Sequence, residues 1–210
     1  MKIRPANTRG VMKKSWIQSL RTFSNNDYWN PNYMNWHCVK VINDDTQQPG
    51  GMVPNHEHKN YDILGYVVSG ELKHTDSLGN INNAVGGQVQ RMWCGRSLWH
   101  TEACVGDTPA HYLQIWITPK ERDTAPFYEL HDRPVEFSLL NINIKQDIKI
   151  TCGQLNGQQT WLIEKPAYLY VVAGSVVVNG VALTEGDGAE LPPTEYAVDS
   201  TAHLILFELT

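Results

Sequence analysis

The sequence predicts an all-β protein built from two tandem antiparallel β-barrel domains of the jelly-roll type, with little helix. Short runs of β-branched and aromatic residues alternate with Gly, Pro and Asn turns along most of the chain. Few stretches show the apolar spacing of three to four residues that is typical of a helix. The second half of the chain also repeats the strand pattern of the first half in the same order. At 210 residues the chain has room for one or two compact domains.

The first elements along the chain are polar. Residues 1–36 are rich in Asn, Ser, Trp and Tyr, and we expect an ordered lead-in there with one short helical turn near residues 14–20. The first clear strand begins at Val39 and is expected to stop at the polar triplet 43–45. Two glycines, at 50 and 51, then turn the chain into the next strand.

That next strand carries the residues on which the functional prediction depends. His56 and His58 are two apart, so on a strand they project from the same face. His100 and Glu102 repeat this spacing. A lone His-x-His pair is more often structural than ligating, but two such pairs in one small domain favour a metal site. Three imidazoles and one carboxylate suit a divalent transition metal better than calcium or magnesium, which prefer oxygen ligands.

Further short strands are expected between these two pairs and after them, separated by Gly, Pro and Asn turns. The segment 119–134, which contains three prolines and two charged clusters, is the expected linker. The linker places a metal-binding domain at residues 1–125 and a second domain at residues 126–210.

The internal repeat supports this division. Tyr66–Gly70 recurs as Tyr170–Gly174, and Ala110–Ile117 recurs in pattern as Ala202–Leu209. The offset between the copies shortens along the chain, so the second copy has shorter loops. Chance similarity between apolar strands is the alternative, and the shared order of the matches argues against it.

The second copy lacks the ligand residues of the first. The positions that match the two histidines of the first pair carry Thr160 and Leu162, and the second pair maps near Tyr196–Val198. We therefore expect the C-terminal domain to be free of metal and to serve stability, a lid or a partner surface.

Composition excludes several classes of function. The net charge is −5, and no Lys/Arg-rich arm is present, which argues against direct nucleic-acid binding. The first ten residues lack the apolar core of a signal peptide, and the most apolar run, 168–183, is broken by glycines, so no membrane span is expected. The cysteines show no Cys-x-x-Cys spacing, which favours a reducing, cytoplasmic setting; they are Cys38, Cys94, Cys104 and Cys152.

Two motifs resemble those of a known superfamily. Gly50-x5-His56-x-His58, followed by Asp62 and Gly70, resembles the first cupin motif, and Gly87–Arg96 running into His100-Thr-Glu resembles the second. Over residues 21–128 the chain resembles the pirin-like bicupins more narrowly, through Ile42–Asp45, Gly70–Asn80, Val89–Met92 and Leu113–Trp116.

The resemblance implies two cupin-type β-barrels, a bicupin, with one metal in the N-terminal domain. Its implied ligands here are His56, His58, His100 and Glu102. Iron, as Fe(II), is the metal most associated with the family, whose members resemble quercetin 2,3-dioxygenases in activity. Other members are described as transcriptional co-regulators, and some have lost the metal.

The sequence departs from the family pattern near the first pair. Asp62 stands where the family usually has glutamate, and its shorter side chain favours a hydrogen bond to a ligand imidazole over direct ligation. The usual proline between the histidines is replaced by Glu57, which points to the opposite face of the strand.

The leading hypothesis is a quercetinase-like, metal-dependent dioxygenase that acts on a polyhydroxylated aromatic through a single mononuclear metal. Glu102 either ligates the metal or acts as the catalytic base for a substrate hydroxyl. Nickel, manganese, copper, cobalt or zinc suits the same ligands as iron does. Residues considered for the rim, with plain core packing as the alternative, are Met52, Tyr61, Trp93 and Trp99.

The alternative is a non-catalytic, metal- or redox-responsive regulatory protein that works through protein partners. Under either hypothesis we expect no direct nucleic-acid or membrane partner, and a monomer or a small homo-oligomer. Structural roles are expected for the remaining candidates: a hydrogen bond near Asp76 for His74, burial for Cys104, and fold-related positions for His111 and His203.

Overall fold

The computed structural model describes residues 1–210 and is almost entirely β, which confirms the predicted fold class. Its one helix is a short 3-10 turn, η1 (Ala6–Thr8). The strands of the first part are β1 (Lys2–Arg4), β2 (Gly10–Lys13), β3 (Ile17–Arg21), β4 (Val39–Gln47), β5 (Met52–His58), β6 (Asp62–Ser69), β7 (Glu71–Asp76), β8 (Ile81–Val85), β9 (Gln88–Trp93), β10 (Leu98–Cys104), β11 (Ala110–Ile117) and β12 (Phe127–Asp132). The later strands are β13 (Ser138–Leu139), β14 (Ile148–Ile163), β15 (Ala167–Val178), β16 (Val181–Thr184), β17 (Gly188–Leu191) and β18 (Thr194–Leu209).

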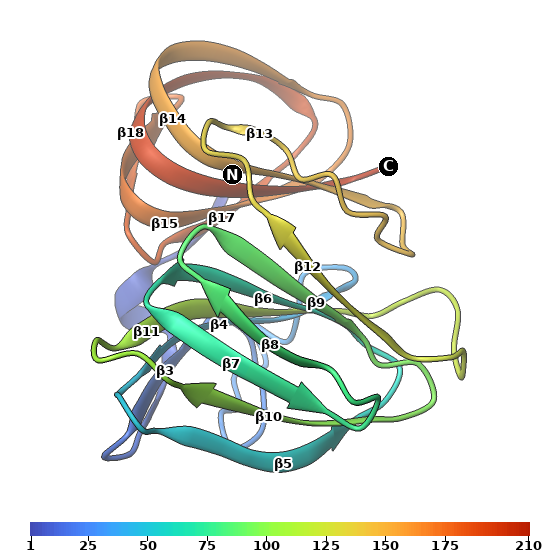
Figure 1. Ribbon diagram of the computed structural model, residues 1–210. Coiled ribbons are helices and arrows are strands. Elements are labelled where there is room, and N and C mark those ends of the chain that lie inside the picture. The colour runs from blue at the N-terminus through green and yellow to red at the C-terminus, as the bar shows by residue number, and fades with distance from the viewer. The chain divides into compact units, whose positions relative to one another are not determined.

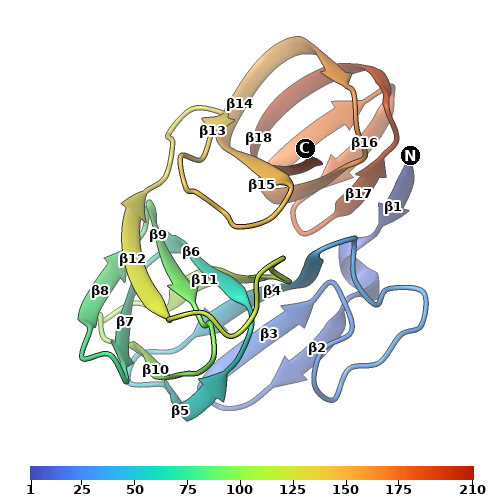
Figure 2. The ribbon, with the colours of Figure 1, turned by 90° about the vertical axis from the view of Figure 1, so that its right-hand side faces the viewer.

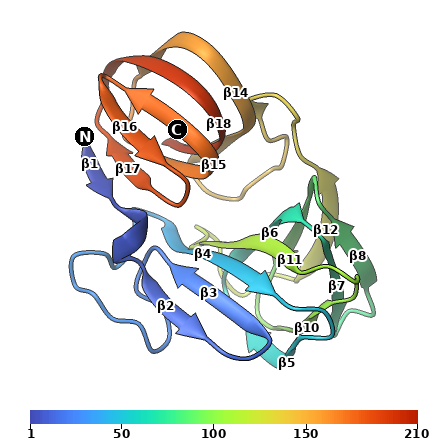
Figure 3. The same ribbon diagram turned by 90° about the vertical axis from the view of Figure 1, so that its left-hand side faces the viewer.

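The chain forms two compact units. The N-terminal unit consists of residues 10–132, and the C-terminal unit combines residues 1–9 with 133–210. The N-terminal unit contains a seven-stranded antiparallel sheet, in the order β12-β9-β6-β11-β4-β3-β2, and a four-stranded sheet, β5-β10-β7-β8 (Figures 1 and 2). The C-terminal unit is built on one seven-stranded sheet, in which β1 lies at the edge beside β17 (Figure 3).

The polar beginning of the chain forms strands where the sequence predicted a lead-in. The expected helical turn near residues 14–20 is wrong, since β2 and β3 form a hairpin there. The expected stop at 43–45 is also wrong, because β4 continues through Asn43 and Asp45 to residue 47. In β3 and β4, several of the side chains that face the interior are polar. The alternation of apolar and polar residues that marks a strand is therefore hidden in the sequence. Within the segment expected to be a linker, residues 127–132 form β12 and pair with β9.

The interior of the N-terminal unit is arranged in layers. Along β10 the inward side chains are Leu98, His100, Glu102 and Cys104, apolar at both ends and polar in the middle. The end residues join two separate apolar clusters, one with Ile63, Met92 and Cys94 and one with Val67, Leu72, Ala84, Ala110 and Tyr112. The strand alternation therefore holds a polar layer between two apolar layers, and the site lies in this layer.

The C-terminal unit has a continuous apolar core. Its two longest strands, β14 and β18, pair over their full length, and β15 lies on the other side of β18. Leu169, Val171, Leu204 and Leu206 are among the buried residues that pack there. No helix of the structure has the length and apolar character that a transmembrane span needs.

Candidate metal centre and cavity

Three imidazoles converge in the polar layer of the N-terminal unit. His56 and His58 lie on one face of β5, and antiparallel pairing places His100 of β10 directly opposite His56. One ring nitrogen from each of the three lies within 4.8 Å of the others. The Nε2 atoms of His56 and His58 are 2.9 Å apart. The structure thus brings together the three histidines that the sequence selected.

The surroundings keep the rings of His58 and His100 neutral and free to donate lone pairs. Burial, followed by the neighbouring histidines, lowers the pKa of His58 to about 4 and that of His100 to about 2. The Nδ1 atom of His56 lies 2.9 Å from the Pro54 carbonyl oxygen, which leaves Nε2 facing the cluster. Neutral imidazole is the form that binds metal ions.

His100 shows why the donor set fits a divalent transition metal. Its side chain is buried, yet neither ring nitrogen has a hydrogen-bond partner. Leaving a buried polar group unsatisfied costs about 1–3 kcal/mol. A cation held between the three rings would satisfy such a nitrogen, and three imidazoles are borderline-soft donors of the type that first-row transition metals prefer.

Neighbouring rings fix the orientation of the cluster. The edge of one ring meets the face of the other where His58 contacts Trp116, with ring centroids 4.7 Å apart. His74 lies between His100 and Tyr128, 5.4 Å from the first ring and stacked at 4.3 Å on the second. Its Nε2 atom lies 2.9 Å from Oδ2 of Asp76, so the predicted structural hydrogen bond of His74 is confirmed.

Glu102 lies outside the group of three imidazoles, held by two glutamines. The pairing with β5 shifts between His100 and Glu102, as a β-bulge does. Gln90 donates to Oε1 at 2.6 Å and Gln114 to Oε2 at 2.5 Å. Burial, followed by the charge of Asp45, raises the pKa of Glu102 to about 8, and the two amide donors oppose this rise. A nearby cation would oppose the rise as well, because it favours the ionised form.

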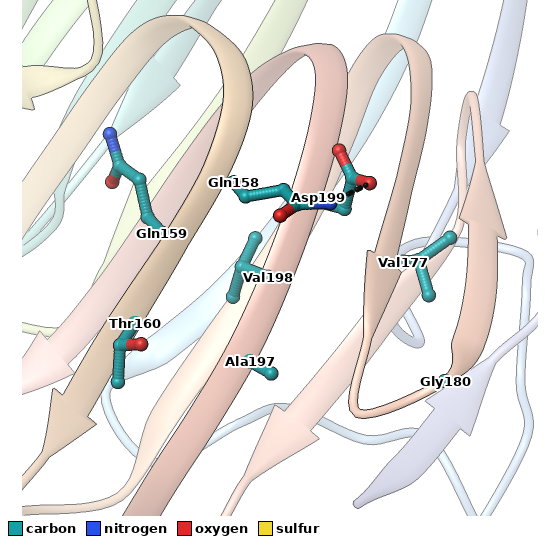
Figure 4. Close-up of a pocket in the computed structure, with 8 residues that line it drawn as sticks. All are labelled: Gln158, Gln159, Thr160, Val177, Gly180, Ala197, Val198 and Asp199. Atoms are coloured by element: carbon teal, nitrogen blue, oxygen red, sulfur yellow. Dashed lines mark hydrogen bonds between the residues drawn. The ribbon is translucent and has the colours of Figure 1, made fainter.

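A cavity of about 210 Å³ opens beside the cluster and joins it to Glu102. The aromatic rings of Trp16 and Trp116 contribute to its wall. Its polar lining includes Ser19, Arg21, Asn25, Asn43, Asp45 and Gln114. A larger hollow of about 480 Å³ lies on the C-terminal unit (Figure 4). No histidine, cysteine or aromatic ring lines that hollow, so we place the candidate site at the smaller cavity.

The proposed rim residues do not line this cavity. Trp93 is buried, stacks on Phe127 and donates from its indole nitrogen to Thr124 Oγ1 at 2.6 Å. Met52 and Trp99 are exposed, and Tyr61 packs against Trp116. The sequence offered no signal for Trp16, Ser19 and Arg21, which do line it, because they belong to the segment mistaken for a polar lead-in.

The remaining candidates serve the fold. Both carboxylate oxygens of Asp62 accept from the Arg91 guanidinium, at 2.9 and 2.8 Å, in a buried ion pair. Such a pair is costly to break, because its removal leaves a buried charge alone. None of the four cysteines is paired in a disulfide, and three of them, including Cys104, are buried. His111 and His203 contact Asp44 and Arg133, respectively.

Comparisons with known proteins find matches for both parts of the chain. The Pirin family model matches residues 3–117, and a model described as the quercetinase C-terminal cupin domain matches residues 140–209. A quercetin 2,3-dioxygenase of Escherichia coli K12 is 32% identical over 225 aligned residues, covering 99% of this chain and 97% of that protein. A pirin-like protein of Caulobacter vibrioides is 32% identical over 204 residues, with 89% and 88% covered.

A solved structure matches equally well. The crystal structure of bacterial pirin YhhW from Escherichia coli in complex with nickel(II) aligns with a TM-score of 0.94 at 32% identity, covering 99% of this chain and 98% of that one. The predicted bicupin fold and the predicted resemblance are therefore both confirmed.

Proposed function

Because the chain belongs to the pirin family, we propose that it is a quercetinase-like dioxygenase that acts on a polyhydroxylated aromatic at a single metal centre in the N-terminal unit. The observation that carries this proposal is the convergence of three imidazoles, two of which line one cavity, with both ring nitrogens of buried His100 unpartnered. A purely structural histidine cluster would be expected to pair such nitrogens.

The proposed ligands are the three imidazoles of His56, His58 and His100, with Glu102 as the fourth. Fe(II) is the proposed metal, and nickel, manganese, copper, cobalt and zinc suit the same donors. The nickel in the Escherichia coli relative supports a divalent ion at this centre. When bound, the metal would supply Lewis-acid activation of a substrate hydroxyl and a redox partner for dioxygen.

The chain's own residues would bind the ring and move a proton. Trp16 and Trp116 offer aromatic surfaces against which a flat ring can pack. In the alternative to ligation, Glu102, which borders the same cavity, would accept the proton of an aromatic hydroxyl on a carboxylate oxygen. Gln90 and Gln114 hold that carboxylate in place.

The proposed setting is a reducing, cytoplasmic compartment, supported by four cysteines that form no disulfide. A small aromatic substrate is the proposed partner, and the assembly state is proposed as a monomer or small homo-oligomer.

Oxygen uptake by iron-loaded protein with quercetin as substrate tests the proposal. We expect uptake by the parent and none by His58→Ala. Glu102→Gln should keep turnover measurable but lower kcat by about 10²–10⁴-fold, as loss of a general base does. His111→Ala is the matched control, since that histidine pairs with Asp44 away from the cavity. Iron-loaded parent that takes up no oxygen with quercetin or pyrogallol would instead support the non-catalytic alternative.

A further inference from the structure

A row of buried polar side chains crosses the seven-stranded sheet beside the histidine cluster. Strand register places Arg21 of β3 opposite Asn43 of β4, and Asn43 opposite Gln114 of β11. The adjacent row begins with Ser19 opposite Asp45. All of these side chains face the interior, where a barrel normally presents apolar residues.

Several polar atoms in these two rows have no hydrogen-bond partner. Oδ1 of Asn43, Oδ1 of Asp45 and Nε of Arg21 are buried and unpartnered, although their side chains line the cavity beside the histidines. Two further unpartnered donors belong to the same lining, Nδ2 of Asn25 and Nε1 of Trp116. Native proteins rarely leave one buried polar atom unsatisfied, so five around one cavity point to a polar occupant.

The rest of the Arg21 and Asp45 side chains is already held, which presents their free atoms in fixed positions. The Arg21 Nη1 atom donates to the Asn25 carbonyl oxygen at 3.1 Å and also to the Asp27 carboxylate. Ser19 donates a hydrogen bond to the carboxyl of Asp45. Arg21 and Asp45 therefore each keep an anchored atom and a free atom, as a preorganised recognition group does.

The cavity limits the size of the enclosed ligand. Pockets that enclose drug-sized molecules measure about 300–1,000 Å³, whereas this one measures about 210 Å³. Such a volume holds one hydroxylated ring, either as a free molecule or as one ring of a larger substrate that extends out of the cavity.

We propose that Arg21, Asn43 and Asp45 form a polar subsite that binds adjacent hydroxyl groups of a single aromatic ring next to the histidine cluster. One hydroxyl donates to Asp45 Oδ1, a neighbouring hydroxyl donates to Asn43 Oδ1, and Arg21 Nε donates to a hydroxyl oxygen. The aromatic nature of the ring rests on the proposed function, whereas the pattern of donors and acceptors follows from the unpartnered atoms. These three residues determine specificity rather than carry the reaction.

The test measures binding of pyrogallol, catechol and phenol to the full-length, zinc-loaded protein by calorimetry. Zinc excludes redox turnover, and the three probes differ only in the number of adjacent hydroxyl groups. We expect the parent to bind pyrogallol at least tenfold more tightly than phenol. Asp45→Asn and Asn43→Leu should each remove most of this preference and keep the zinc content of the parent.

Asp44→Asn is the matched control, because Asp44 neighbours Asp45 in sequence, pairs with His111 and does not line the cavity. The control should keep the preference for pyrogallol. If a variant fails to fold, the affinities of the parent for the three probes still test whether binding depends on adjacent hydroxyl groups. A parent without the preference, or variants that lose affinity for phenol and pyrogallol equally, would overturn the subsite.

Oxygen uptake with quercetin separates this inference from the proposed function. The iron-loaded parent could take up no oxygen while binding still depends on the hydroxyl groups and on Asp45. That result would support the subsite and contradict the proposed dioxygenase activity. Uptake by the parent, with an unchanged pyrogallol preference in both variants, would keep the dioxygenase and reject the subsite.

Discussion

His100 is the residue at which structure and proposed function are most closely connected. Its imidazole is buried, neutral and without a partner, so it costs stability in the metal-free protein and gains a partner only when metal binds. His56 and His58 are less buried than His100 and have protein contacts of their own.

The first prediction concerns His100→Leu. The metal-free variant should be at least as stable as the metal-free parent, because an apolar side chain of similar size replaces an unsatisfied polar one. The parent should gain about 4 kcal/mol from zinc at a thousand times its dissociation constant, and the variant should gain almost nothing. Thermal melting with and without zinc measures both effects. His111→Leu should retain the full response to zinc, and a normal response in His100→Leu would contradict the ligand assignment.

Asp45 gives a prediction about pH. Burial, followed by the nearby charge of Asp44, raises its pKa from 3.8 to about 7, while Ser19, Arg21 and His111 oppose the rise. Because the folded state holds this proton more tightly than the unfolded state, its stabilising contribution is complete below pH 3.8 and is lost as the pH rises through 7. Tyr112 and Glu102 also face this carboxyl and titrate above its range.

We therefore expect the stability of Asp45→Asn relative to the metal-free parent to increase with pH over this range. Urea unfolding at several pH values measures the difference, in which titrations shared by both proteins cancel. A difference that stays constant with pH would show that the carboxyl is not buried as described.

At the scale of elements, the polar layer depends on a glycine. Gly65 on β6 lies opposite Gln90 on β9 and opposite Gln114 on β11. A Cβ atom at Gly65 would lie 2.6 Å from the Cγ and Nε2 atoms of Gln90, a side chain that is fully buried. The absence of a side chain at Gly65 thus leaves room for Gln90 to reach Glu102.

Gly65→Ala should therefore displace Gln90 and cost about 1–3 kcal/mol of stability through overpacking. Zinc affinity should fall about 10–100-fold, as it does when a group that orients a ligand is lost. Chemical unfolding and zinc titration provide the two readouts. Gly106→Ala should be nearly neutral, because the nearest atom to its new Cβ lies 3.8 Å away. Zinc affinity unchanged in Gly65→Ala would show that Gln90 does not support the site.

The same elements explain what the sequence could and could not predict. The histidine pairs were found because a two-residue spacing on a strand has a direct geometric meaning. Strand β3 and the second half of β4 were missed because Ser19, Arg21, Asn43 and Asp45 occupy inward positions where the pattern expects apolar residues. Polar residues lining a cavity resemble polar residues facing solvent until the strand pairing is known.

The same reasoning applies to Glu102. Its spacing from His100 placed it correctly on the inner face, but no pattern indicated that Gln90 and Gln114 would hold its carboxylate. Those contacts come from β9 and β11, which flank β10 in sequence but belong to the other sheet, so only the packing of the two sheets brings the three side chains together. The fold class was predictable because periodicity and repetition extend over the whole chain.

At the scale of the whole molecule, the first nine residues belong to the C-terminal unit. Strand β1 pairs with β17, the Ala6 amide donates to Asp187 Oδ1 at 2.7 Å, and Arg9 donates to the Tyr170 hydroxyl at 2.8 Å. The beginning of the chain thus completes an edge of a sheet made by its end.

Deletion of residues 1–9 should therefore weaken the C-terminal unit and spare the metal centre. Hydrogen exchange should accelerate in β17, which loses its edge partner, while the amides of β5 and β10 stay protected and zinc content is unchanged. Faster exchange confined to the N-terminal unit would contradict this assignment of the first residues.

The central claim is that His56, His58 and His100 hold one divalent metal ion. Its most direct test is the metal content of protein purified without chelator or affinity-resin metal, measured by mass spectrometry beside the His56→Ala/His58→Ala double variant. We expect close to one equivalent of iron or another divalent transition metal in the parent and almost none in the variant. A parent that is empty and also refuses added metal would contradict it.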